Sequence, residues 1–292
     1  MKGREAGPRA AARAALEALT PAAAYARRDQ FAVLDVRDDA AFRAGHLAGS
    51  GHVPRAELND RTSELPPRAE PLLVVADGTE EAGTAAAHLE RLGFTRVAWL
   101  DAPLGVLPGG LEDRGPSARL WRPAPFLEEM LPRLPRPRPG DAALDVAAGA
   151  GREAVYLAQH GYEVEARDRD EDALRRAAAL AARHGARIAT VRTDLEGASV
   201  RLPAGRFRLV VCFRYLHRPL FAEIEHAIAP GGHLMYETYR LGQEKHGRPR
   251  RARFLLQPGE LEAAFPTLIV EHYAEMEPAG GPVTARLLAR RP

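Results

Sequence analysis

The sequence predicts an α/β protein with two domains, each built around a parallel sheet. Short apolar runs that are typical of buried strands alternate with helical patterns in both halves of the chain. Such alternation favours parallel strands joined by crossover helices. Between the halves, residues 116–140 are rich in proline, which removes amide donors and packs poorly into a core. A chain of 292 residues has room for two cores.

These features predict a first domain over residues 1–115, a proline-rich linker over 116–140 and a second domain over 141–292. The segment Phe126–Leu131 is expected to form a short helix within the linker. The composition is that of a globular protein, with 46% hydrophobic and 27% charged residues and a formal net charge of +2. This small charge by itself gives no support to a nucleic-acid surface.

The sequence lacks the features of membrane and disulfide-bonded proteins. No apolar run approaches the roughly 18 residues that span a bilayer, and the first residues lack the apolar core of a signal peptide. We therefore expect a cytoplasmic protein without a membrane partner. Cys212 is the only cysteine, which excludes an internal disulfide and a cysteine-based zinc site. We expect Cys212 to lie in a core, and no metal spacing is present.

The pattern of the first half predicts three strands and a helix. Strands are expected at 31–36, 71–76 and 94–100, and a helix at 82–92. Several short signatures in this half occur in a fixed order: Leu34–Arg37 followed by Phe42, Gly45–Gly49, His52–Pro54, and Leu92–Phe94 before Trp99 and Leu100. Over roughly residues 15–115 this pattern resembles the rhodanese-like domain family.

The resemblance implies sulfur transfer through a cysteine in the loop after the central strand, where a persulfide anion would be stabilised. In this chain Ala76 or Asp77 stands at that position, and neither can form a persulfide. We expect a retained fold without this chemistry, in which Asp35, Arg37 and His46 hold the domain together. Such a domain could serve as a scaffold or as a surface for homo-oligomer formation.

The second half predicts five strands and three helices in alternation. The strands are expected at 142–147, 161–166, 187–192, 208–213 and 233–238, and the helices at 152–160, 170–183 and 220–228. After the first of these strands, Gly149 and Gly151 form a tight turn into a helix, where backbone amides can approach an anionic or polar ligand. Asp168 follows the next strand, where an acidic side chain can bind ribose hydroxyls.

The order of these motifs resembles the class I S-adenosylmethionine-dependent methyltransferases, which have a Rossmann-like fold. The matches are the glycine turn after Asp145, the acids Asp168 and Asp194, and the turn Pro230–Gly232. Within that group, the tellurite-resistance-type methyltransferases are the most similar, on Gly149–Arg152, Tyr215–Arg218, Tyr236–Tyr239 and Phe254–Leu261. Ala147 stands where a first glycine is common, and Glu153 where aspartate is frequent.

The resemblance implies S-adenosylmethionine as the cofactor. The cofactor-binding residues that it predicts are Asp145, Ala147, Gly149, Gly151, Arg152, Asp168, Arg169, Asp194, Leu195 and Phe213. A nicotinamide-dependent dehydrogenase is the alternative for the glycine turn. It is less favoured, because the Pro-Gly-Gly turn and the acid after the third strand are not part of its fingerprint.

Residues just after the fourth strand are the candidates for contact with a methyl acceptor. Tyr215, His217 and Arg218 lie there, with His217 as base or as a structural histidine, while Glu237 and Tyr239 are weaker candidates. The basic segment 240–253 favours a small anionic or soft nucleophilic acceptor. It lacks interleaved aromatics, so nucleic acid is less favoured. A non-catalytic S-adenosylmethionine sensor and an RNA methyltransferase remain the alternatives.

Overall fold

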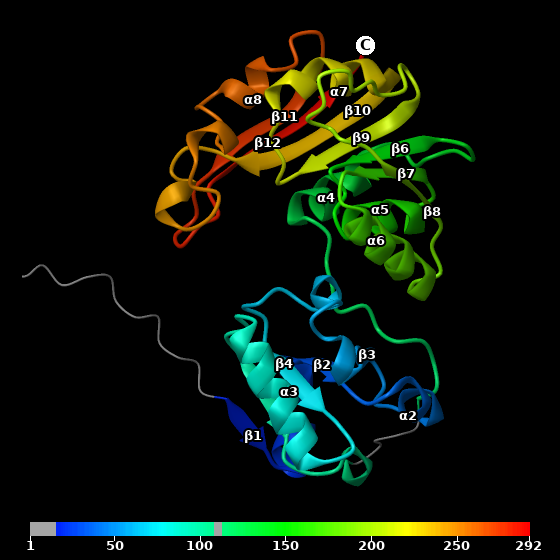
Figure 1. Cartoon of the computed structure of the whole chain (residues 1–292), viewed down its shortest axis with the longest axis vertical. Coiled ribbons are helices and arrows are strands. Elements are labelled where there is room, and N and C mark those ends of the chain that lie inside the picture. The colour runs from blue at the N-terminus through cyan, green and yellow to red at the C-terminus, as the bar shows by residue number, and fades with distance from the viewer. Residues whose placement is uncertain (1–15, 108–112) are drawn as a thin grey trace, which may run out of the picture. The chain divides into compact units, whose positions relative to one another are not determined.

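The computed structural model describes residues 16–107 and 113–292. The chain divides into two compact units between Trp121 and Arg122, and Figure 1 shows a separate sheet in each. Residues 1–15 and 108–112, which the predicted first domain includes, lie outside the described residues. Among the described helices, none has the length and apolar character needed to cross a bilayer.

The first unit is a five-stranded, wholly parallel sheet with strand order β1-β5-β4-β2-β3. Its strands are β1 (Glu17–Leu19), β2 (Ala32–Asp35), β3 (Gly51–His52), β4 (Leu72–Val75) and β5 (Val97–Leu100). Its helices are α1 (Pro21–Arg27), α2 (Asp39–Ala44) and α3 (Thr79–Arg91). All four residues of β4 are buried, as expected for the central strand of a parallel sheet covered on both faces.

A buried ion pair holds the end of β2 in place. Arg37 Nη2 lies 2.7 Å from Asp35 Oδ2, and the same nitrogen donates to the Gly45 carbonyl at 2.7 Å. His46 stacks on Phe42 at 3.8 Å between ring centroids, and its Nδ1 lies 3.0 Å from the Phe42 carbonyl oxygen. These contacts agree with the structural role expected for Asp35, Arg37 and His46.

The second unit contains a seven-stranded sheet with order β11-β12-β10-β9-β6-β7-β8. Its strands are β6 (Ala142–Val146), β7 (Glu163–Asp168), β8 (Ile188–Arg192), β9 (Phe207–Phe213), β10 (Ile228–Tyr239), β11 (Ile269–Met276) and β12 (Thr284–Arg290). Its helices are α4 (Pro125–Met130), α5 (Arg152–Gln159), α6 (Glu171–Arg183), α7 (Phe221–Ala227) and α8 (Glu260–Ala263). Strands β6 to β10 run parallel, whereas β12 runs antiparallel to both β10 and β11. The α/β fold class and the Rossmann-like second unit are thus as the sequence predicts.

β11 and β12 lie outside the five strands that the sequence predicts, and β10 is longer than the strand expected at 233–238. β11 is an edge strand whose residues are partly or fully exposed, so it contains no continuous apolar run. β10 begins at Ile228 and includes the Pro-Gly-Gly turn, with a register shift between Ile228 and His233. Because strands at sheet edges are half solvated, an apolar pattern is a weak signal for them.

The short helix expected in the proline-rich segment packs onto the second unit. Phe126, Leu127 and Met130 of α4 are buried, and the Arg286 guanidinium lies 5.6 Å from the centre of the Phe126 ring. The Ala124 N–H donates to Glu153 Oε1 of α5 at 3.0 Å. The division between the compact units thus falls inside the segment 116–140.

The turn between β6 and α5 requires left-handed backbone at three positions. Ala147, Gly149 and Gly151 have φ angles of 59°, 52° and 77°, a region that side chains with a Cβ occupy at a cost. At Gly151 an added Cβ would lie 2.5 Å from Ala177 Cβ of α6, whereas at Gly149 nothing lies within 4 Å. Gly151 therefore allows α6 to pack against the turn.

This difference predicts unequal effects of two matched substitutions. Gly151→Ala should lower the free energy of unfolding of the second unit by about 3 kcal/mol, since about 1 kcal/mol of backbone strain adds to the cost of overpacking. Gly149→Ala should cost only the strain, about 1 kcal/mol. Urea unfolding of both variants measures this. Equal losses would contradict the importance of the Ala177 contact.

Candidate functional site

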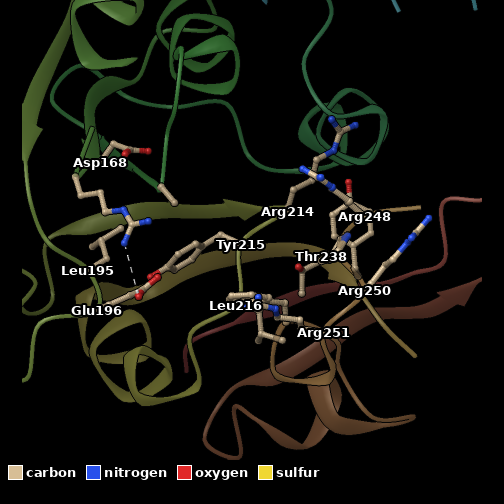
Figure 2. Close-up of a pocket in the computed structure, with 15 residues that line it drawn as sticks. Asp168, Leu195, Glu196, Arg214, Tyr215, Leu216, Thr238, Arg248, Arg250 and Arg251 are labelled. Atoms are coloured by element: carbon tan, nitrogen blue, oxygen red, sulfur yellow. Dashed lines mark ion pairs between the residues drawn. The ribbon is translucent and has the colours of Figure 1, made fainter. Parts of the chain in front are cut away.

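A cavity of about 920 Å³ opens at the carboxyl ends of the parallel strands of the second unit (Figure 2). Loops that follow parallel strands converge at this edge of an open sheet, which is where such folds bind ligands. The residues that line the cavity are Ala147, Asp168, Arg169, Leu195, Glu196, Arg214, Tyr215, Leu216, Thr238, Tyr239, Arg248, Pro249, Arg250, Arg251 and Phe254.

One end of the cavity carries Asp168, the acidic residue that ends β7. The Gly149 N–H donates to Asp168 Oδ2 at 2.9 Å, and the Asp170 N–H donates to Asp168 Oδ1 at 2.9 Å. These two bonds fix the carboxylate beside the glycine turn. Because a carboxylate can accept about four hydrogen bonds, both oxygens of Asp168 retain capacity for a ligand's hydroxyl groups.

Asp145 lies beneath the glycine turn and does not line the cavity. Its side chain is buried, and its Oδ2 has no hydrogen-bond partner among the described residues. Burial raises the pKa of Asp145 well above its usual value, and the negative charge of Glu153 adds to this increase. A buried polar atom without a partner is costly, which points to a group that the described residues do not supply.

Tyr215 stands between the two ends of the cavity, with its ring near Glu196 in Figure 2. The Tyr236 hydroxyl donates to the Tyr215 carbonyl at 2.9 Å and so fixes this residue's backbone. The Tyr215 hydroxyl is itself buried without a partner in the described chain. Burial raises the pKa of Tyr215, and the charge of Glu196 adds to the effect. The hydroxyl therefore keeps its proton at neutral pH and can donate to a ligand.

The other end of the cavity is built by a loop clamped to the end of β10. The Leu256 N–H donates to the Tyr239 carbonyl at 3.0 Å, and the Leu241 N–H donates to the Leu256 carbonyl at 2.9 Å. Within the loop, buried Gln243 donates from Nε2 to the Arg248 carbonyl at 3.2 Å. These bonds close both ends of the basic segment and position Arg248, Arg250 and Arg251 on the cavity wall.

The two ends of the cavity differ in charge. Arg169 lies 3.8 Å from Glu196, which balances its charge. By contrast, no ion pair within the described residues involves Arg214, Arg248, Arg250 or Arg251. The loop end is therefore strongly positive and suits an anionic ligand.

Three acceptor-site candidates from the sequence do not line this cavity. Arg218 Nη2 lies 2.8 Å from Glu260 Oε2 and also donates to the Leu255 carbonyl at 3.0 Å. The Arg218 guanidinium therefore links its own turn to α8 and to the loop before α8. His217 precedes the turn that contains Arg218. Glu237 is buried, where it accepts bonds from Thr284 and Arg286. These contacts favour structural roles for Arg218 and Glu237.

The cofactor-site candidates are divided in a similar way. Ala147, Asp168, Arg169 and Leu195 line the cavity, whereas Gly149, Gly151 and Arg152 shape the turn and helix start beside it. Asp194 is exposed, and its Oδ1 accepts the Glu196 N–H at 3.2 Å. It thereby holds the turn that presents Leu195 and Glu196. Phe213, the last residue of β9, is also outside the lining.

Sequence reasoning missed Arg214, Glu196 and Thr238 as lining residues. Arg214 follows β9 directly, with a φ of 58° and an N–H that donates to the Glu237 carbonyl at 2.8 Å. Its place after the fourth strand was a usable signal. Thr238 gave no such signal, because a polar residue within a buried strand does not indicate from the sequence that it lines a cavity.

The loop after β4 in the first unit has no sulfur nucleophile. Ala76 is buried, and Asp77 is exposed with its Oδ1 3.5 Å from Arg37 Nη1. Helix α3 begins two residues later with Glu80 and Glu81 in its first turn. Cys212 is buried in β9 of the other unit.

Comparisons with known proteins match each unit separately. A model described as a rhodanese-like domain matches residues 20–102, and one described as a methyltransferase domain matches residues 143–232. Thiosulfate sulfurtransferase GlpE from Pseudomonas fluorescens is 34% identical over 107 residues, which span 36% of this chain and 83% of that protein.

An uncharacterized protein from Schizosaccharomyces pombe is 30% identical over 146 residues, covering 44% of this chain and 42% of that protein. The chain thus spans less than half the length of that relative. TehB from Haemophilus influenzae, a solved structure, superposes with a TM-score of 0.46 at 17% identity, over 57% of this chain and 61% of TehB. The chain therefore belongs to the rhodanese-like domain family through residues 20–102 and carries a methyltransferase domain over residues 143–232.

Proposed function

We propose that this protein is an S-adenosylmethionine-dependent methyltransferase that acts on a small anionic acceptor, with the rhodanese-like unit as a non-catalytic accessory. One observation carries the proposal. A single cavity joins a ribose-type acid, Asp168, beside a glycine turn to a group of unpaired arginines, and Tyr215 stands between them. The first end suits the cofactor and the second suits the acceptor.

The residues at the first end fit S-adenosylmethionine. Open space around Gly149 allows a ligand to approach the backbone, and Asp168 has free lone pairs for ribose hydroxyls. Leu195 offers an apolar surface for the adenine ring. Asp145, with its unpartnered Oδ2, lies under the turn where a positively charged amino group would be stabilised. When bound, S-adenosylmethionine supplies a methyl group already activated by its sulfonium.

The residues at the second end orient the acceptor without supplying a base. Among the described lining residues the carboxylates, Asp168 and Glu196, belong to the cofactor end, and histidine is absent. The acceptor should therefore bring its own nucleophilic charge, as a thiolate or a selenium or tellurium oxyanion does. Arginines would hold such an anion in line with the methyl carbon, which supplies much of the rate acceleration when the electrophile is already activated.

The shape of the cavity favours a small-molecule acceptor over RNA, and methyl transfer distinguishes an enzyme from a sensor. The arginines of the loop line a hollow beside Phe254 and Tyr239, which suits a small molecule better than the extended phosphate backbone of RNA. A sensor without catalysis would bind S-adenosylmethionine and leave its methyl group in place. Methyl transfer therefore separates an enzyme from a sensor, and the fraction that receives the label identifies the acceptor class.

The cofactor assignment predicts that Asp168→Asn weakens S-adenosylmethionine binding by about 1 to 3 kcal/mol, because a carboxylate acceptor for ribose is lost. Isothermal titration calorimetry measures the change. Asp172→Asn is the matched control, since this exposed acid of α6 lies outside the lining and should leave affinity nearly unchanged. Unaltered affinity in Asp168→Asn would refute the assignment of the cofactor end.

The acceptor assignment predicts that Arg250→Ala/Arg251→Ala raises the acceptor KM several-fold with a smaller loss in kcat, because these cations bind substrate and transition state alike. The acceptor is first located by incubating the protein with methyl-labelled S-adenosylmethionine and cell extract divided into small-molecule, RNA and protein fractions. Lys245→Ala, an exposed cation on the same loop outside the lining, should behave as wild type. Label found only in RNA or protein would exclude a small anion.

The loop after β4 predicts that the first unit has no thiosulfate sulfurtransferase activity. Ala76 and Asp77 lack a thiol, and Cys212 belongs to the other unit. Thiocyanate formation from thiosulfate and cyanide should remain at background. Turnover in the Cys212→Ser variant would show that the first unit transfers sulfur by another group. Self-association through this unit stays a prediction.

A further inference from the structure

A second cavity, of about 290 Å³, lies at the opposite edge of the second unit's sheet. Asp141 and Tyr162, which line it, come directly before β6 and β7, and Arg208 lies near the start of β9. Arg214, which lines the first cavity, comes six residues after Arg208, just beyond the end of β9. At about 3.3 Å per residue, the two cavities are separated by roughly 20 Å along β9.

Three arginines give this second cavity an excess of positive charge. Arg136 and Arg138 have no carboxylate partner among the described side chains, and Arg208 donates from Nη1 to the Pro230 carbonyl at 2.7 Å, which leaves its other donors available. Asp141 is the acidic residue in the lining, and its Oδ2 accepts the Arg138 N–H at 2.8 Å.

His233 adds no further charge at neutral pH. Burial lowers the pKa of His233, against the opposing effect of Glu271, whose Oε2 lies 3.5 Å from His233 Nε2. The neutral imidazole can still exchange a hydrogen bond with a ligand. The positive potential of the cavity therefore comes from the three guanidinium groups.

The backbone that carries two of these arginines is rigid. Arg136 and Arg138 alternate with Pro135, Pro137 and Pro139, and each proline fixes its φ angle. A turn in which the Asp141 N–H donates to the Arg138 carbonyl at 2.9 Å ends the segment. Because the backbone is already ordered, less conformational entropy is lost when a ligand binds.

A groove of about 650 Å³ adjoins the cavity and shares Leu134, Pro135, Arg136 and Tyr162 with it. Further along, the groove is lined by Leu131 and Pro132. A ligand whose anionic group enters the cavity could therefore rest an apolar or aromatic body on this groove.

We propose that this second cavity binds the phosphate group of a small phosphorylated ligand. Guanidinium groups recognise phosphate oxygens through paired, charge-assisted hydrogen bonds. Three guanidinium groups facing one committed carboxylate match a dianion better than a monoanion. The site is independent of the methyl-transfer cavity, because it lies at the other edge of the sheet and shares no lining residue with it.

The test compares inorganic phosphate and phenyl phosphate by isothermal titration calorimetry with the full chain at constant ionic strength. Arg136→Ala/Arg138→Ala should weaken binding of both ligands roughly tenfold or more. Arg133→Ala is the matched control: it lies on the same segment, pairs with Glu129 at 3.4 Å and is outside the lining. Arg250→Ala/Arg251→Ala controls for binding in the first cavity. Arg133→Ala should retain wild-type affinity for phosphate, and Arg250→Ala/Arg251→Ala should retain the phosphate binding that is lost in Arg136→Ala/Arg138→Ala.

Stronger binding of phenyl phosphate than of inorganic phosphate would support a ligand whose body occupies the groove. If the wild-type protein binds both ligands equally and Arg136→Ala/Arg138→Ala loses this binding, the result would support recognition of the phosphate group alone. Unchanged affinity in that variant, or loss only in Arg250→Ala/Arg251→Ala, would overturn the proposal. S-adenosylmethionine binding by each variant, measured in parallel, confirms that the second unit is folded.

Discussion

The close approach of α6 to the turn after β6 is the constraint on which the candidate site depends. Gly151 has no Cβ, so Ala177 can pack where a larger residue would clash. This contact holds the left-handed turn from Ala147 to Gly151, and the turn in turn presents the Gly149 N–H to Asp168. A shift of this turn would move both the backbone amides and the acid at the end of the cavity for which we propose cofactor binding.

The charge of the cavity is divided by the sheet itself. Strands β7 and β8 end at the acidic side, where Glu196 neutralises Arg169, while β9 and β10 end at the side that the basic loop covers. The loop stays in place because buried Gln243 accepts the Val283 N–H at 2.8 Å through its side-chain oxygen. Hydrogen bonds to backbone groups of the loop therefore fix the positions of its arginines. The guanidinium groups of these arginines remain available for a ligand.

The contacts that stabilise the first unit do not involve a thiol. The pair formed by Asp35 and Arg37 and the stacking of His46 on Phe42 stabilise the loops around β2, and none of these contacts needs a thiol. In place of a nucleophile, Asp77 faces Arg37. An acid next to this guanidinium would oppose binding of an anion in a loop that contains no cysteine.

Local patterns in the sequence predict those parts of the structure that depend on residues close together in the chain. Apolar runs ending in glycine or acidic residues located β6 and β7, the turn at Gly149 and Gly151, and Asp168, because these signals lie within a few residues of one another. The same holds for the absent thiol at Ala76 and Asp77. β11 was not predictable in this way, because this edge strand is half solvated and alternates weakly. β12 lies between β10 and β11, and its antiparallel partners come together only on the assembled sheet.

Which charged residues face the cavity depends on contacts between residues that are far apart in the chain. Arg214, Arg218 and Arg251 cannot be told apart from their sequence neighbours. In the structure Arg218 pairs with Glu260, while the other two line the cavity. Partners far along the chain settle this choice, and Glu260 is 42 residues from Arg218. The arginines of the second cavity were hidden for the same reason, because Arg136 and Arg208 meet only when the proline-rich segment packs against the amino ends of the strands.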